Sequence, residues 1–199
     1  MKIGFLASGN GSNMQAIIDA CKSGSLKARP VLVISNNSQS GAIERAKKEN
    51  IPYSHISGKT HPLPDKAIAD ALSDHSVDIV VLAGYMKKVG SELLSRYKGA
   101  ILNIHPALLP KFGGDGMYGI RVHQAVLAAG EKESGVSIHI VDENYDTGPV
   151  IAQVRAPVEP DDTPESLAAR VLEQEHLLFP KTLEKIATGE IKIPGYGLK

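Results

Sequence analysis

Short apolar runs alternate, over the first half of the chain, with segments whose apolar residues recur at helical spacing. Residues 79–83 are apolar without a break, which is typical of a strand covered on both faces in a parallel sheet. Four runs are expected to be strands: residues 3–7, 30–35, 77–83 and 100–104. Helices are expected between them, including one that Pro64 opens at its first position. This alternation predicts an α/β fold with an open, doubly wound and mostly parallel sheet, of the Rossmann-like kind.

The second half of the chain has a different character. Residues 136–141 and 150–154 are expected to form a C-terminal pair of strands joined by a loop. A long helix is expected after them, with Thr163 as its cap and Pro164 at its first helical position.

The end of that helix is predicted from its breakers. Pro180 should kink or interrupt it, Gly189 should end it, and residues 191–199 should form a tail. No repeat, low-complexity tract or linker divides the sequence, so residues 1–199 are predicted to be one domain.

The overall charge disfavours a nucleic-acid binder. Lys and Arg together number 22, as do Asp and Glu, so the basic excess expected for contact with a phosphate backbone is missing. The single cysteine, Cys21, excludes an internal disulfide and a thiolate zinc cluster, and its place in an apolar helical stripe predicts a buried core thiol. No stretch approaches the ~20 apolar residues that span a bilayer, and the N-terminus does not resemble a signal peptide. A cytoplasmic protein is expected.

A glycine turn follows the first expected strand and leads directly into a helix. Such a turn lets the backbone approach a ligand, and the free N–H groups of the first helical turn make an anion site there. The dinucleotide pattern GxGxxG is incomplete because Met14 stands at its third glycine position, and no P-loop lysine follows. A single phosphate group therefore fits best. The alternative is a plain turn in which Ser12 or Asn13 caps the helix.

Asn103 lies at the end of the fourth expected strand, and His105 follows directly after it. Pro106 biases His105 toward extended geometry, so the two side chains should project to the same side. An amide donor beside an imidazole suits an oxyanion that develops during acyl or formyl transfer. The alternative is a satisfied polar pair at a strand end. The remaining histidines show neither a metal-binding pattern nor comparable partner spacing: His55, His61, His75, His123, His139 and His176.

The loop over residues 141–149 is dense in carboxylates. One of them could orient His105 and accept a proton through water, but residue chemistry does not choose among Asp142, Glu143 and Asp146. A solvated turn is the alternative. Taken alone, residues 174–176 (Gln-Glu-His) look like surface polar residues of the last helix.

Together these segments resemble the folate-dependent formyltransferase family. The resemblance covers nearly the whole chain, and each motif is weak alone but the set is specific. The matching segments are residues 7–13 (ASGNGSN), 81–86 (VLAGYM), 102–106 (LNIHP), 108–111 (LLPK), 146–149 (DTGP) and 174–176 (QEH).

The resemblance implies a role for each matching position. Catalysis is assigned to Asn103, His105 and Asp146. The substrate phosphate and ribose are assigned to Gly11, Ser12, Asn13 and Glu175. The folate pocket is assigned to Met86, Lys87, Val89, Ile140, Val141 and Asp142. Residues 1–100 would then be the phosphate-binding half and residues 101–199 the catalytic and folate-binding half. Relatives often carry Arg at position 87, and the glycine-rich stretch 113–119 is longer than in close relatives.

The implied reaction moves a formyl group from 10-formyltetrahydrofolate, as co-substrate, to the amine of glycinamide ribonucleotide in purine synthesis. Asn103 and a protonated His105 would stabilise the oxyanion, while Asp146 keeps His105 charged and relays the amine proton through water. No metal, nucleic acid or membrane is expected to take part, and the protein would be a monomer or homodimer.

Three alternatives remain. A methionyl-tRNA formyltransferase would be expected to carry a further C-terminal domain and a basic surface. A formyltetrahydrofolate hydrolase would use water as acceptor and would usually carry an N-terminal regulatory domain. A non-catalytic module that binds a phosphate ligand would leave Asn103, His105 and Asp146 without a purpose.

Overall fold

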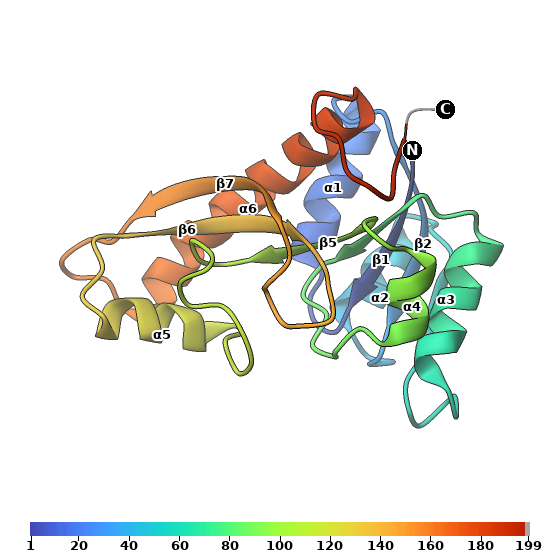
Figure 1. The fold of residues 1–199 in the computed structure, drawn as a ribbon, viewed down its shortest axis with the longest axis horizontal. Helices are drawn as coiled ribbons and strands as arrows, with labels where there is room; N and C mark the ends of the chain where they lie inside the picture. Colours follow the sequence, from blue (N-terminus) through green and yellow to red (C-terminus); the bar gives the residue numbers. More distant parts are fainter. Residues whose placement is uncertain (198–199) are drawn as a thin grey trace.

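The computed structural model of the protein describes residues 1–197 and contains one seven-stranded sheet in the order β3-β2-β1-β4-β5-β6-β7 (Figure 1). The strands are β1 (Lys2–Ala7), β2 (Arg29–Ser35), β3 (Tyr53–His55), β4 (Ile79–Leu82), β5 (Ile101–His105), β6 (Glu133–Ile140) and β7 (Val150–Pro157). Strands β1 to β5 are parallel, whereas β6 is antiparallel to β5 and to β7. The predicted open, mostly parallel sheet with a C-terminal strand pair is confirmed.

Helices cover both faces of the sheet. They are α1 (Ser12–Ser23), α2 (Gly41–Lys48), α3 (Pro64–Asp74), α4 (Ser91–Arg96), α5 (Ile120–Ala128) and α6 (Pro164–Ala187). Side chains alternate along β1, so Phe5 packs in one core with Met14 of α1, and Leu6 packs in the other with Ile68 of α3. The first core is closed by α1, α2, α5 and α6, and the second by α3 and α4.

The long helix α6 lies against α1, and the two run side by side in Figure 1. Thr163 and Ser166 form a reciprocal capping box, in which each side chain accepts a hydrogen bond from the other's backbone N–H, at 3.2 and 2.9 Å. The helix continues through Pro180, so of the two predicted outcomes the interruption is wrong, and a kink stays a prediction. Phe179 and Leu183, both fully buried, hold the chain on either side of this proline.

The C-terminal end of α6 matches the sequence. The helix ends at Ala187, and Gly189 follows with a φ of 81°, the left-handed conformation that glycine adopts most easily. Residues 191–197 of the predicted tail follow, and Leu198 and Lys199 lie outside the described residues.

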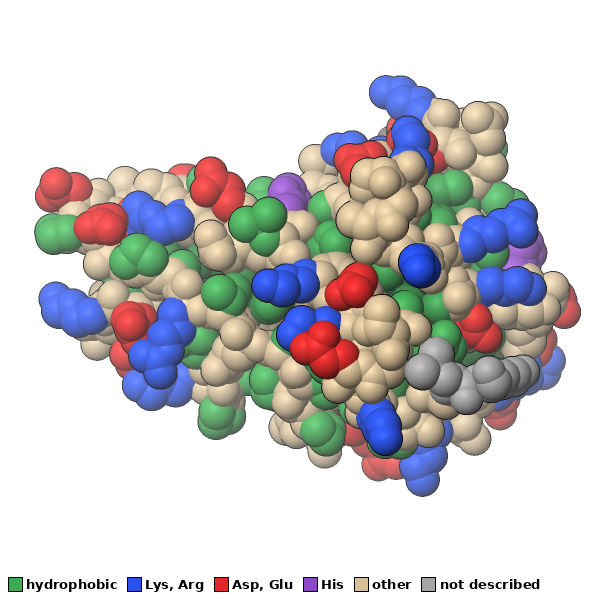
Figure 2. Space-filling model, turned by 90° about the horizontal axis from the view of Figure 1, so that it is seen from above, with side chains coloured by type: hydrophobic (Ala, Val, Ile, Leu, Met, Phe, Trp, Pro, Cys, Tyr) green, Lys and Arg blue, Asp and Glu red, His purple; other side chains and the backbone are tan. Residues whose placement is uncertain are grey.

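The distribution of charge and the character of the helices can be read from the structure. On the face shown in Figure 2, acidic and basic side chains are interspersed rather than gathered by sign. None of the helices in residues 1–197 is long and apolar enough to cross a membrane.

Cys21 is only partly buried, which corrects the prediction of a buried thiol, because it stands at the edge of the stripe that packs into the first core.

Candidate active site

The glycine turn after β1 forms the open N-terminus of α1. Gly11 is the N-cap residue, in the left-handed conformation with a φ of 71°, and no side chain within residues 1–197 caps this helix. The alternative in which Ser12 or Asn13 supplies the cap is therefore wrong. The first hydrogen bond of the helix runs from the Gln15 N–H to the Gly11 carbonyl. The backbone N–H groups before Gln15 therefore have no carbonyl partner within the helix. They form a donor cluster of the kind that binds a phosphate group.

Asn13 connects this turn to α6. Its Nδ2 donates a hydrogen bond of 2.5 Å to Glu175 Oε2, and within the described chain its Oδ1 is buried without a partner. Glu175 is only 8% exposed, so the expectation of a surface residue is wrong for this position. Burial raises the pKa of Glu175 to about 7, although the hydrogen bond from Asn13 acts in the opposite direction.

Asn103 and His105 share one face of β5, as their spacing predicts. The antiparallel register places His139 of β6 directly opposite Asn103, with 3.0 Å between Asn103 Nδ2 and His139 Nε2. Asp146, from the β6–β7 loop, closes the cluster. Its Oδ2 lies 3.4 Å from His105 Nδ1, and its Oδ1 lies 3.3 Å from His139 Nε2 and 3.4 Å from Asn103 Nδ2.

The carboxylate of Asp146 is held ionised by its neighbours. Burial alone would raise its pKa, but the hydrogen bond from His139, the charge of His105 and the Gly114 N–H at 3.0 Å together lower the pKa of Asp146 below its usual value. The residue has a φ of 56°, a conformation that is costly for most side chains but tolerated by Asp.

His105 is buried, with acceptors at both ring nitrogens. Nε2 lies 2.7 Å from the Phe112 carbonyl oxygen, and Nδ1 faces Asp146. Burial lowers the pKa of His105, while Asp146 and the Phe112 carbonyl act to raise it and the nearby His139 lowers it further. The net direction is downward, so burial outweighs the opposing effect of Asp146 on this ring.

His139 is a member of the cluster that the sequence did not reveal. The prediction that it has no comparable partner is wrong, because its partners come from another strand and a loop. No signal in the sequence places it there, because its position opposite Asn103 depends on the register between β5 and β6. Within residues 1–197, no group of three or more His, Cys, Asp or Glu side chains is arranged to hold a metal ion.

One cavity of about 470 Å³ joins the two ends of the site. Its lining includes Asn13 and Glu175 from the phosphate end and Asn103, His105 and Asp146 from the cluster. Gly11 and Ser12 adjoin Asn13 but do not line it. The glycine-rich stretch forms one of its walls, and Met86, which is half exposed, forms part of another.

The predicted folate residues other than Met86 fall into two groups. Lys87, Val89, Val141 and Asp142 line a cleft of about 60 Å³ that Asn103 and Asp146 also border. Ile140 does not line it, because its side chain is 8% exposed and packs in the first core.

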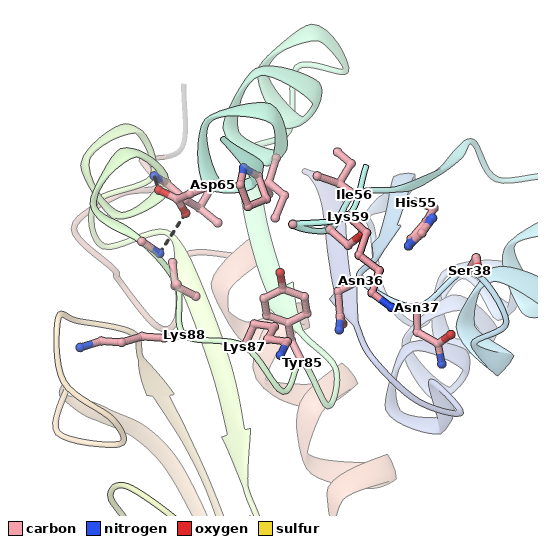
Figure 3. Close-up of a pocket in the computed structure, with 17 residues that line it drawn as sticks. Asn36, Asn37, Ser38, His55, Ile56, Lys59, Asp65, Tyr85, Lys87 and Lys88 are labelled. Carbon is pink, nitrogen blue, oxygen red and sulfur yellow. Dashed lines mark hydrogen bonds between the residues drawn. The ribbon is translucent and has the colours of Figure 1, made fainter. Parts of the chain in front are cut away.

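A larger cavity of about 610 Å³ lies on the other side of the segment after β4 (Figure 3). Three lysines contribute to its lining: Lys59, Lys87 and Lys88. Its one carboxylate is that of Asp65, which accepts hydrogen bonds from the backbone N–H groups of Gly90, Glu92 and Leu93. The cavity therefore presents more positive than negative charge to a ligand.

Comparisons with known proteins agree with this arrangement. A family model described as "Formyl transferase" matches residues 1–183. A chloroplastic phosphoribosylglycinamide formyltransferase of Arabidopsis thaliana is 43% identical over 96% of this chain, and one of Vigna unguiculata is 42% identical over 96%. The chain spans 67% and 62% of the lengths of these two relatives.

A solved structure extends the comparison. Glycinamide ribonucleotide transformylase 1 of Symbiobacterium toebii superposes with a TM-score of 0.91 at 37% identity, over 98% of this chain and 91% of that one. The family model and the plant relatives together cover almost all of this sequence. This chain belongs to the formyl transferase family.

Proposed function

We propose that this protein transfers the formyl group of 10-formyltetrahydrofolate to the amine of glycinamide ribonucleotide, a step of purine synthesis. The observation that carries the proposal is the single cavity in which Asn13, beside the open turn of α1, faces the cluster of Asn103, His105 and Asp146. The relatives of this chain, named for the same activity, support it.

The acceptor occupies the phosphate end of this cavity. The phosphate group binds the N–H groups of Gly11, Ser12 and Asn13, where the helix dipole also favours negative charge. The ribose hydroxyls reach Glu175 and the free Oδ1 of Asn13. This places the amine of the acceptor toward the cluster.

The folate carrier occupies the adjoining cleft and exposes its formyl group to Asn103. Lys87, Val89, Val141 and Asp142 contact it in the cleft, and Met86 contacts it from the wall of the acceptor cavity. Ile140 contributes through its backbone rather than its buried side chain. The carboxylates of the folate tail pair with the ammonium group of Lys87, which acts as a point charge. An arginine at this position would instead bind a carboxylate through two parallel hydrogen bonds. The cationic cavity in Figure 3 receives the rest of this tail.

In this proposal Asn103 and His105 act on the developing charge. As the amine forms its bond to the formyl carbon, Asn103 Nδ2 donates a hydrogen bond to the formyl oxygen. The His105 Nε2–H, which faces the Phe112 carbonyl in the free protein, exchanges that acceptor for the formyl oxygen. The oxyanion and Asp146 both favour a charged ring, so His105 takes up the proton that the amine loses, with Asp146 relaying it through water. The proton then passes to the folate nitrogen as its bond to the formyl carbon breaks.

Two broader expectations remain proposals. The continuous sheet, to which both halves of the chain contribute strands, supports a single domain over residues 1–199. A monomer or homodimer acting in the cytoplasm without a metal also stays a prediction.

A direct assay tests the proposed reaction. The purified protein is mixed with 10-formyltetrahydrofolate, with and without glycinamide ribonucleotide, and the release of tetrahydrofolate is followed by absorbance. We expect release that requires the acceptor and equals the formylated product formed. Release without the acceptor would indicate hydrolysis instead, and no release in either mixture would leave only ligand binding.

A further inference from the structure

One segment borders all three cavities of the site. Residues 84–90, which follow β4, contribute Gly84, Tyr85 and Met86 to the wall of the acceptor cavity. The same segment lines both the cleft and the larger cavity, through Tyr85 and residues 87–89. A shift at the beginning of the segment therefore changes the sites of both substrates, whereas a shift at its far end changes only the folate side.

Ser8 anchors the beginning of this segment. Its backbone N–H donates to the Gly84 carbonyl at 3.0 Å, and its Oγ accepts the N–H of Met86 at 2.8 Å. The same hydroxyl donates to Asn36 Oδ1 at 2.5 Å, so it is fixed in orientation by partners on two strand ends. Ser8 is also the residue that opens the phosphate turn, so this anchor connects the acceptor site to the folate segment.

Asp65 of α3 anchors the far end. Its Oδ1 accepts the N–H of Gly90 at 2.9 Å, the contact drawn as a dashed line in Figure 3. Its Oδ2 accepts the N–H groups of Glu92 and Leu93 at 2.9 and 3.2 Å, which caps the short helix α4. A Cβ at position 90 would lie 2.5 Å from this carboxylate, so only glycine allows the approach.

We propose that Ser8 and Asp65 are positioning residues that fix the segment 84–90 between the two substrates, with separable effects on them. This inference rests on the proposed formyl transfer. The Ser8 hydroxyl holds Met86, which lines the acceptor cavity and leads into the residues that line the folate cleft, so its loss weakens the binding of both substrates. Asp65 touches only the folate-facing end, so its loss weakens the binding of the folate carrier alone. Neither residue contacts the reacting atoms, so kcat changes little.

The expected size follows from the bonds removed. A hydrogen bond of this kind typically changes an equilibrium by about 2- to 10-fold. Ser8→Ala should raise the KM for both substrates by about this factor and leave kcat within about twofold. Asp65→Asn keeps one acceptor oxygen but turns an amide toward Glu92 and Leu93, so it should raise only the folate KM by a similar factor.

Steady-state kinetics with each substrate varied in turn test this pattern. Ser54→Ala and Asp74→Asn are the matched controls, since Ser54 lies on β3 and Asp74 ends α3, and neither lines any of the three cavities. Ser8→Thr keeps the hydroxyl and should restore both KM values. Circular dichroism confirms that each variant is folded.

Calorimetric titration with 5-formyltetrahydrofolate gives a readout that does not depend on turnover. Asp65→Asn and Ser8→Ala should both weaken its binding, and the controls should not. Wild-type protein that fails to form product would refute the proposed function, while the titration would still test the anchors. Unchanged folate affinity in both folded variants, or equal losses for both substrates in Asp65→Asn, would overturn the inference.

Discussion

Replacing Glu175 with glutamine separates the cost of burying its charge from the benefit of its hydrogen bond. Glutamine keeps a carbonyl oxygen for the Asn13 Nδ2 donor but cannot ionise. Because burial raises the pKa of Glu175 to about 7, the folded protein resists the loss of this proton and the unfolded chain does not. The wild-type carboxyl therefore lowers the free energy of unfolding at alkaline pH, whereas the glutamine of the variant should not lower it.

The size and the pH range follow from the two pKa values. Below an unfolded pKa of 4.5 the carboxyl is protonated in both states, and above about 7 it is ionised in both, so stability is lost between these limits as the pH rises. The difference corresponds to about 3 kcal/mol. For a chain of this length that is roughly 6–12 °C in Tm. Glu175→Gln should match the wild type near pH 4.5 and exceed it by this amount at pH 8.

Thermal unfolding of both proteins across this pH range measures the difference. Glu173→Gln is the control, because Glu173 is an exposed residue of the same helix and its replacement makes the same chemical change without a buried carboxyl. A Glu175→Gln advantage that does not grow with pH would refute the argument. A buried carboxylate that reduces stability is typical of a functional position, so the same variant should bind the acceptor less tightly.

Further predictions concern the cluster and the scaffold. Asn103→Ala and His105→Ala should each lower kcat by ~10²–10³, because an oxyanion donor contributes ~3 kcal/mol, and near-wild-type turnover in both would exclude the proposed mechanism. Asp146→Asn should lower the pKa of His105 further, since it removes the charge that most raises it, and an NMR titration showing a higher value would contradict this. Burial raises the pKa of Cys21 to about 11, so its reaction with a disulfide reagent at pH 8 should be roughly 100-fold slower than that of a free thiol. Thr163→Ala removes the cap of α6 and should cost about 1 kcal/mol, or a Tm lower by roughly 2–4 °C in a melting curve.

The sheet was predictable where strands are covered on both faces. An unbroken apolar run marks β4, and helical spacing marks α3, which precedes it, and α1, which follows β1. The elements that the sequence did not reveal are short or polar. Strand β3 has three residues and α4 has six, too few for a period to appear. Four of the eight residues of α2 are charged, and α5 starts directly after a glycine-rich stretch.

The candidate site was predictable only where its geometry is local. The strand period places Asn103 and His105 on one face, and that period is visible in the sequence. His139 lies beside them because of the β5–β6 register, which depends on how distant segments pair. The burial of Glu175 likewise depends on α6 packing against α1. An alternating pattern identifies a face but not what covers it.

The loop after β6 shows how a choice that residue chemistry left open follows from backbone geometry. The Oδ1 of Asp142 accepts the Asn144 N–H at 3.0 Å and the Thr147 hydroxyl at 2.8 Å, so this carboxylate shapes the turn. A Cβ at Gly148 would lie 1.8 Å from the Ile140 carbonyl oxygen, so the loop returns to β6 at a distance that only glycine allows. Between these two constraints Asp146 adopts a left-handed conformation and turns toward His105. Asp146 is therefore the acidic residue of this loop that lies beside the histidine, rather than Asp142 or Glu143.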